Sequence, residues 1–199
     1  MGFQKDGFDP LKKIQIAESD MPAELSKLNF RTLSPFQRAL MVTDGTVTKF
    51  IEAYTLDPVE ITRLGQKCYS LEENHPWLMA EKGMDVMFRE VMIRGIYSHT
   101  LYVYGVSYII PERLPGNMRE RLEVQGESIG RILNDYEMET RREVLWFGRE
   151  RLTQLPRQLS SIADGEFISR TYRIIAEGKP IVLITERFPV LADVLPHHH

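Results

Sequence analysis

Two charged residues, Arg89 and Glu186, interrupt apolar faces of segments that are expected to form β-strands. Side chains two residues apart on a strand lie on the same face, so each face can be examined separately. The neighbours on each face are apolar: Met87, Val91 and Ile93 beside Arg89, and Val182, Ile184 and Phe188 beside Glu186. The spacing therefore predicts one buried positive charge and one buried negative charge.

Buried charges of this kind have few roles. An ionised group taken out of water must be paired, change its protonation or receive a ligand, because isolated burial is too costly. An arginine can bind a carboxylate through two parallel hydrogen bonds, and a glutamate can exchange a proton with a substrate. The alternative is structural: Arg89 and Glu186 pair with each other, or lie at a sheet edge and reach water. Spacing alone favours this structural interpretation.

Other residues that could do chemistry carry weaker signals. The stretch from Gly126 to Arg131 contains two glycines without dinucleotide spacing, so it is interpreted as a loop and a helix start whose backbone N–H groups can receive a carboxylate. His75 and His99 are isolated, which disfavours a metal site. The single cysteine, Cys68, rules out an internal disulfide and is interpreted as a small apolar strand residue.

Two further groups of charged or titratable residues receive no chemical role. Arg141 and Arg142, followed by Arg149 and Arg151, are interpreted as a solvated strand edge. Three histidines end the chain at residues 197–199, where they are interpreted as part of a purification tag.

The elements expected to position these residues are mostly strands. A serine followed by a proline at residues 34–35 starts a predicted helix that stops at 44–45, and a second short helix opens at residue 46. Helical turns are predicted at 117–123 and 128–133, and strands at 59–71, 85–94, 99–110, 137–148, 167–175 and 181–188. Because hairpins join most of these strands, we expect an antiparallel sheet with helices on one face, an α+β fold.

Charge and composition exclude several classes of protein. The 199 residues have a formal net charge of -3, and the basic residues are scattered, so nucleic acid is a poor partner. No segment approaches eighteen consecutive apolar residues and no apolar signal core is visible, so we expect no membrane association and no export. One cysteine fits a reducing compartment. The expectation is a cytoplasmic protein of one domain, whose oligomeric state the sequence leaves open.

Four segments of the sequence resemble chorismate pyruvate-lyases, which split chorismate into 4-hydroxybenzoate and pyruvate. The resemblance is closest to the actinobacterial and archaeal branch of these enzymes. The segments are DGTVTK at 44–49, FREV at 88–91, SIGRIL at 128–133 and the stretch from Arg173 to Phe188. Each segment is short, but the four occur in the family's order and extend the similarity over roughly residues 33–190.

The resemblance implies a fold, a site and a reaction. It implies one chorismate lyase-like domain at 33–192, with an irregular or helical arm at 1–32 and a tail at 193–199. Its six-stranded antiparallel sheet would enclose the ligand beneath helical flaps. It places the catalytic arginine on Arg89 and the catalytic glutamate on Glu186, and it assigns substrate contacts to backbone amides at Val47, or Thr46 if the register slips by one, and at Ile129. The substrate would be chorismate, and neither metal nor cofactor would be needed.

The sequence also leaves two questions open. Burial favours the protonated form of Glu186, whereas a nearby Arg89 would favour the ionised form, and the sequence does not decide between them. The alternative function is an aromatic-acid binding or sensing domain without catalysis, because effector domains of some bacterial transcription regulators resemble this fold. The segment before residue 33 is short and not basic, so we prefer the lyase.

Overall fold

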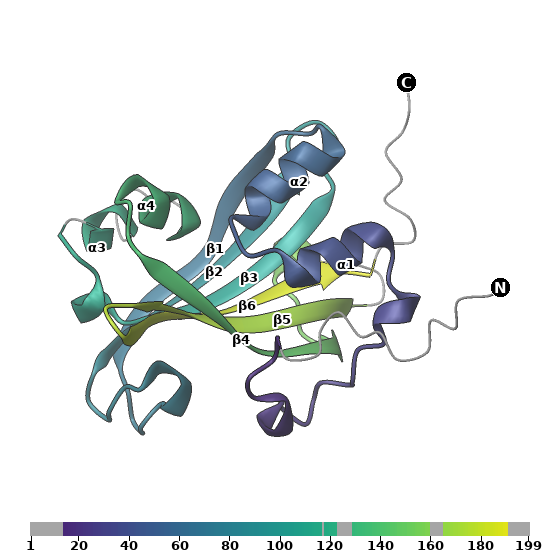
Figure 1. Ribbon diagram of the computed structural model, residues 1–199. Helices are drawn as coiled ribbons and strands as arrows, with labels where there is room; N and C mark the ends of the chain where they lie inside the picture. The colour runs from purple at the N-terminus through teal and green to yellow at the C-terminus, as the bar shows by residue number, and fades with distance from the viewer. Residues whose placement is uncertain (1–13, 117, 123–128, 160–164, 191–199) are drawn as a thin grey trace.

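Six strands form one antiparallel sheet in the computed structural model, which describes residues 14–116, 118–122, 129–159 and 165–190 (Figure 1). The strands are β1 (Val59–Ser70), β2 (Asp85–Gly95), β3 (Leu101–Ile109), β4 (Thr140–Arg151), β5 (Glu166–Ala176) and β6 (Lys179–Pro189). Their order across the sheet is β1-β2-β3-β6-β5-β4, and every neighbouring pair is antiparallel. The predicted six-stranded α+β fold is confirmed.

Both predicted hairpins are present, and local chemistry explains their turns. The carboxylate of Asp57 accepts hydrogen bonds from the backbone N–H groups of Tyr97 and Ser98, at 3.0 and 3.1 Å, which fixes the turn between β2 and β3. A Cβ at Gly95 would overlap this carboxylate, so the turn needs a glycine there. Between β5 and β6, residues 177–178 have φ values of 50° and 78°. Tight two-residue hairpins require such left-handed values.

The helices are short and begin close to where the sequence places them. The α-helices of the described residues are α1 (Pro35–Val42), α2 (Val47–Thr55), α3 (Met118–Glu120) and α4 (Ile129–Asp135). The 3-10 helices are η1 (Glu18–Asp20), η2 (Phe30–Thr32), η3 (Pro76–Leu78), η4 (Pro111–Arg113) and η6 (Arg157–Leu159). Helix α1 begins with a capping box, in which the side chains of Ser34 and Gln37 each accept a hydrogen bond from the other's backbone N–H.

Two groups of helices cover the same face of the sheet at opposite ends (Figure 1). Helices α1 and α2 contribute Phe36, Leu40, Met41, Val47 and Ile51 to a core that includes Ile93, Val103 and Phe188 of the sheet. Helices α3 and α4 belong to a second core, in which Met118, Ile132 and Leu133 meet Met87, Tyr172 and Val182. This face therefore carries two separate apolar cores, with the middle of the sheet between them.

Strand β4 differs from its prediction. The alternation suggested residues 137–148, whereas the strand spans Thr140–Arg151. Glu137 has φ 48°, so the chain is still turning there after α4, and a bulge between Val144 and Trp146 changes which residues share a face. Such a bulge breaks the two-residue period on which the prediction rests.

The N-terminal segment lies along the free edge of β4. The backbone N–H groups of Ile16 and Ala17 donate to the carbonyls of Val144 and Leu145, at 3.0 and 3.1 Å. Further along, Ser26 and Arg149 form an isolated antiparallel bridge. These contacts cover backbone groups that an edge strand would otherwise expose. The predicted arm is therefore irregular over its described part, while residues 1–13 and the predicted tail at 193–199 lie outside the described residues.

Candidate active site

A cavity of about 100 Å³ lies on the covered face of the sheet, between the two apolar cores, and residues of both cores line it. It exceeds by several times the roughly 10–15 Å³ that one water needs, so it is a ligand-sized space rather than a packing gap. Its apolar and small lining residues are Gly45, Thr46, Val47, Thr48, Ile61, Val91, Ile93, Val103, Gly105, Val106, Ser107, Ile129, Gly130, Ile174 and Ile184. Its remaining lining residues are Arg89, Arg142, Tyr172 and Glu186. All five predicted site residues therefore line one cavity.

Arg89 lies on β2 with its side chain almost completely removed from water, because the residue is only 1% exposed. Burial, together with the positive charge of Arg63, lowers the pKa of Arg89 to about 10. The guanidinium still carries its charge at neutral pH, in a site where water does little to screen it. A ligand carboxylate in the cavity would stabilise this charge.

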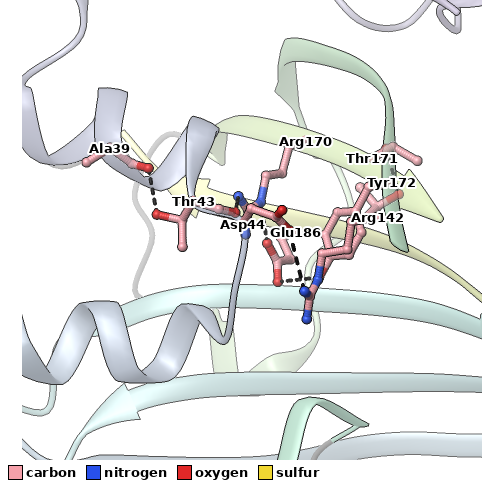
Figure 2. Close-up of polar contacts among 9 residues, drawn as sticks. Ala39, Thr43, Asp44, Arg142, Arg170, Thr171, Tyr172 and Glu186 are labelled. Carbon is pink, nitrogen blue, oxygen red and sulfur yellow. Dashed lines mark hydrogen bonds and ion pairs between the residues drawn. The ribbon is translucent and has the colours of Figure 1, made fainter. Parts of the chain in front are cut away.

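Glu186 lies on β6, opposite Gly105 of β3 and Arg170 of β5. Its carboxylate accepts hydrogen bonds from Arg170 Nε at 2.6 Å and from the Tyr172 hydroxyl at 3.0 Å, as Figure 2 shows. The sequence suggested Arg89 as the neighbouring cation, and the structure places Arg170 against this carboxylate instead. Glu186 is thus an ion-paired, oriented hydrogen-bond acceptor at the cavity.

Arg170 is itself fixed from two sides. It is only 3% exposed, and its Nη1 donates to the backbone carbonyl of Thr43 at 2.7 Å, just after α1. Burial, the largest single effect, would lower the pKa of Arg170, but the charge and hydrogen bond of Glu186, together with Tyr172 and Asp44, raise it overall. Burial, followed by the same negative charge, raises the pKa of Tyr172, which therefore stays protonated and donates to Glu186. Both partners hold the carboxylate in one orientation.

The starts of two helices complete the cavity wall. Thr46 is the N-cap of α2 and makes no side-chain cap hydrogen bond, while Val47 is the first residue of this helix. Ile129 and Gly130 belong to α4, and a Cβ at Gly130 would lie 3.4 Å from Thr46 Cγ2, so α4 adjoins the start of α2. Backbone N–H groups of a first helical turn can receive an anion. The predicted contacts at Val47 and Ile129 have suitable positions.

Sequence reasoning missed two arginines of this site. Arg142 lines the cavity, although the run that contains it was interpreted as a solvated strand edge. That interpretation holds for Arg141, whose side chain is 70% exposed, and is wrong for Arg142, because adjacent strand residues point to opposite faces. Arg170 interrupts the apolar positions Ile168 and Tyr172 in the same way that Arg89 interrupts its strand. The pattern that found Arg89 could have found Arg170.

Two other candidate sites stay outside this cavity. Cys68 is exposed on β1, on the outer strand of the sheet. His75 caps η3 by accepting the Leu78 N–H at its Nδ1, at 3.3 Å. Among the described residues, no three or more histidine, cysteine, aspartate or glutamate side chains form a possible metal site. In the same part of the chain, no helix has the length and apolar character needed to cross a membrane.

A six-stranded antiparallel sheet with helices on one face, and a ligand-sized cavity on that face, defines the chorismate lyase-like fold. Solved structures share this fold. The effector domain of PhnF from Mycobacterium smegmatis matches with a TM-score of 0.60 and 11% identity, over 75% of this chain and 91% of that one. The gene product SA0254 from Staphylococcus aureus matches with a TM-score of 0.53 and 13% identity, over 73% and 88% of the two chains.

Sequence comparison gives the family. Residues 41–195 match the family described as chorismate pyruvate-lyase Rv2949c-like, and the chain belongs to this family. A curated relative from Mycobacterium leprae, named chorismate pyruvate-lyase, is 27% identical over 82% of this chain and 79% of its own length. A relative from Methanocaldococcus jannaschii, named putative lyase MJ0807, is 27% identical over 84% of this chain and 85% of its own. The predicted family and its actinobacterial and archaeal branch are confirmed.

Proposed function

We propose that this protein is a chorismate pyruvate-lyase that converts chorismate into 4-hydroxybenzoate and pyruvate. The observation that carries the proposal is one cavity lined by Arg89, by the ion-paired Glu186 and by the starts of α2 and α4. Membership of the chorismate pyruvate-lyase family supports it. The curated mycobacterial relatives of that name support it further.

The reaction requires little covalent chemistry from the protein. The ether bond between ring carbon 3 and the enolpyruvyl oxygen breaks, and its electron pair leaves with that oxygen. Ring carbon 4 loses its hydrogen as a proton, so the ring becomes aromatic and its hydroxyl becomes a phenol. The departing enolpyruvate takes up a proton at its methylene carbon and becomes pyruvate. Nothing is oxidised or reduced overall, so orientation and proton management suffice.

The site residues supply these two needs. Arg89 would bind the enolpyruvyl carboxylate and stabilise the charge that develops as pyruvate leaves. Glu186, as an ion-paired acceptor, would accept a hydrogen bond from the ring hydroxyl and assist removal of the proton at carbon 4. Backbone N–H groups at Val47, with Thr46 as the alternative register, and at Ile129 would hold the ring carboxylate. Arg170 and Tyr172 would keep Glu186 in the required orientation.

Direct assay of the purified protein tests this proposal. The protein is incubated with chorismate in buffer that contains EDTA, and 4-hydroxybenzoate and pyruvate are quantified separately. We expect equal amounts of the two products, formed faster than in a protein-free control, with no requirement for a divalent ion. Absence of both products from a folded preparation that binds 4-hydroxybenzoate would sink the proposal.

A binding or sensing role without catalysis is the second candidate. The observation that favours it is the structural similarity to the PhnF effector domain and to a transcriptional regulator of the GntR family from Bacillus cereus. A sensor needs the ligand contacts of Arg89 but has no use for an oriented proton acceptor such as Glu186. Tight binding of 4-hydroxybenzoate together with unchanged chorismate would favour this alternative.

A further inference from the structure

Arg142 is a third charged residue of the cavity, and the roles proposed above do not use it. The charged side chains that line the cavity are those of Arg89, Arg142 and Glu186. The Nε atom of Arg142 is buried and has no hydrogen-bond partner among the described residues. Its Nη1 lies 3.5 Å from an oxygen of Asp44, whose side chain is 80% exposed. An ion pair this long and exposed contributes little to stability, so the guanidinium of Arg142 can still bind an anionic group of a ligand.

The place of Arg142 in the sheet sets it apart from Arg89. Glu186 lies on β6, with β2 two strands away on one side and β4 two strands away on the other. Arg89 on β2 and Arg142 on β4 therefore approach the cavity from opposite sides of Glu186. Arg142 pairs across the sheet with Ile174, another lining residue, which places its side chain on the cavity face.

Arg142 also lies at the end of the cavity where the helices start. Its contact Asp44 directly precedes the lining segment at 45–48, which leads into α2. Gly130 of α4 adjoins Thr46 of that segment. Figure 2 shows Asp44, Arg142 and Tyr172 grouped beside Glu186. This corner therefore combines one guanidinium with the start of α2.

The charges of the site fit a ligand with two negative groups. Arg170 compensates the charge of Glu186 through their 2.6 Å ion pair. The cavity lining also includes two arginines, Arg89 on one side of Glu186 and Arg142 on the other. Chorismate carries two carboxylates: one on the ring, opposite the hydroxyl-bearing carbon, and one on the enolpyruvyl group. With the enolpyruvyl carboxylate at Arg89, the second lining arginine, Arg142, is left for the ring carboxylate.

We propose that Arg142 binds the ring carboxylate and is a specificity-determining residue for aromatic acids in this cavity. The inference rests on the proposed function for the substrate, and it extends to any benzoate that binds here. Arg142 then recognises the group that substrate and product share, whereas Arg89 recognises the group that only the substrate carries.

Calorimetric titration of two ligands tests this role, because they differ only in charge. 4-Hydroxybenzoate and the nearly isosteric, uncharged 4-hydroxybenzamide are titrated into the parent protein and into Arg142→Met. We expect the variant to bind the benzoate about 10- to 100-fold more weakly and the amide almost unchanged, because only the benzoate loses a charge-assisted contact. Arg141→Met is the matched control, since it removes the adjacent arginine from the outer face, and it should bind both ligands like the parent.

A second variant leaves Arg142 in place, so the test does not depend on how Arg142→Met folds. Asp44→Asn removes the exposed carboxylate that competes for Arg142, and it should tighten 4-hydroxybenzoate binding without changing amide binding. The inference is overturned if Arg142→Met weakens binding of both ligands equally, or if neither Arg142→Met nor Asp44→Asn changes binding of 4-hydroxybenzoate. Either result overturns it even if the parent turns over chorismate. A parent that prefers the benzoate through Arg142 but leaves chorismate intact would uphold the inference and defeat only the lyase proposal.

Discussion

Arg89 and Glu186 are both buried, but the groups around Arg89 disfavour its charge, whereas an ion pair compensates the charge of Glu186. Burial and the charge of Arg63 act against the charged form of Arg89 and lower its pKa to about 10. Glu186 instead has Arg170 at 2.6 Å and a tyrosine hydroxyl at 3.0 Å. Arg89 is therefore a charge that gains from a bound anion, whereas Glu186 is an acceptor whose orientation is already fixed. Different consequences follow for substitution of each residue.

Substitution of Arg89 should separate function from stability. Arg89→Met keeps a long side chain but removes the charge, so chorismate turnover should be lost and the substrate should bind more weakly, by on the order of 2–5 kcal/mol. The lowering of its pKa from 12.5 to about 10 corresponds to at most about 3 kcal/mol of burial cost, which the variant no longer carries. Urea unfolding should show stability equal to or above the parent. A variant that is active, or that fails to fold, contradicts this assignment.

Substitution of Glu186 should have the opposite signature. Glu186→Gln preserves size and one acceptor but leaves the charge of Arg170 uncompensated at 3% exposure. Removing one partner of a buried ion pair costs about 3–5 kcal/mol, so the melting temperature should fall. Below that temperature the variant should bind 4-hydroxybenzoate and fail to turn over chorismate. Parent-like turnover would show that the glutamate is structural and takes no part in proton transfer.

The pKa of Arg89 also predicts how ligand binding depends on pH. The enolpyruvyl carboxylate of chorismate is ionised throughout the alkaline range, and it should bind only the protonated guanidinium. The affinity of Glu186→Gln for chorismate, which this variant should not turn over, should therefore stay constant from about pH 7 to 9 and fall as pH rises above about 10. Chorismate binding near pH 10 should take up protons, which calorimetry in two buffers of different ionisation enthalpy measures. Adding Arg89→Met to this variant should abolish the dependence, and its absence from Glu186→Gln alone would place Arg89 outside the ligand contact.

At the residue scale, strand alternation could predict Arg89 and Glu186 because each stands alone among apolar neighbours. It could not predict that Arg170 neutralises Glu186, because that pairing depends on the register between β5 and β6. The ordered similarity to chorismate pyruvate-lyases made the difference, since spacing alone favoured a structural pair. The catalytic roles themselves remain predictions.

At the scale of elements, the middle strand β3 keeps the cavity open. Gly105 lies between Val91 of β2 and Glu186 of β6, and a Cβ at this position would come within 3.1 Å of Val91 Cγ2. A side chain here would enter the space beside the acceptor. Packing therefore explains why residue 105 is a glycine, and no sequence pattern predicted this.

Gly105→Val should therefore block the cavity from the side of the sheet. Its two methyl groups would occupy part of a cavity of about 100 Å³, so binding of 4-hydroxybenzoate and turnover should both fall by at least tenfold. Valine is favoured in strands, so the sheet should persist, as circular dichroism can verify. Gly65→Val is a suitable control, because Gly65 lies on β1 outside the cavity lining and a Cβ there would approach only the side chain of Glu90, at 3.1 Å. Unchanged binding in Gly105→Val would mean that the ligand does not reach the floor of the cavity.

Elements with local signals were predictable, and elements set by distant contacts were not. Turn residues in the sequence predict the two hairpins, and the serine before the proline at 34–35 predicts the start of α1. The boundaries of β4 shifted because a bulge and a left-handed residue at 137 depend on packing against the neighbouring strand. The arm along β4 could not be placed, because its bridge joins residues 26 and 149.

At the scale of the molecule, the sequence could not predict how the cavity is enclosed. The cavity exists because two separate apolar cores, one under α1 and α2 and the other under α3 and α4, leave a space between them on the same face of the sheet. Residues 46 and 130 adjoin although more than eighty positions separate them in the chain. A ligand held in this way joins both cores, so its binding should stabilise the whole fold rather than one element.

Product binding should therefore raise the melting temperature of the entire domain in one transition. A ligand at a hundred times its dissociation constant adds about 2.7 kcal/mol to stability. For a chain of this size each kcal/mol corresponds to about 2–4 °C, so 4-hydroxybenzoate should raise the midpoint by about 5–10 °C. Differential scanning calorimetry measures this shift, and Gly105→Val should show little of it. A two-step transition, with only one step moved by the ligand, would show that the cores unfold separately and that the ligand does not bridge them.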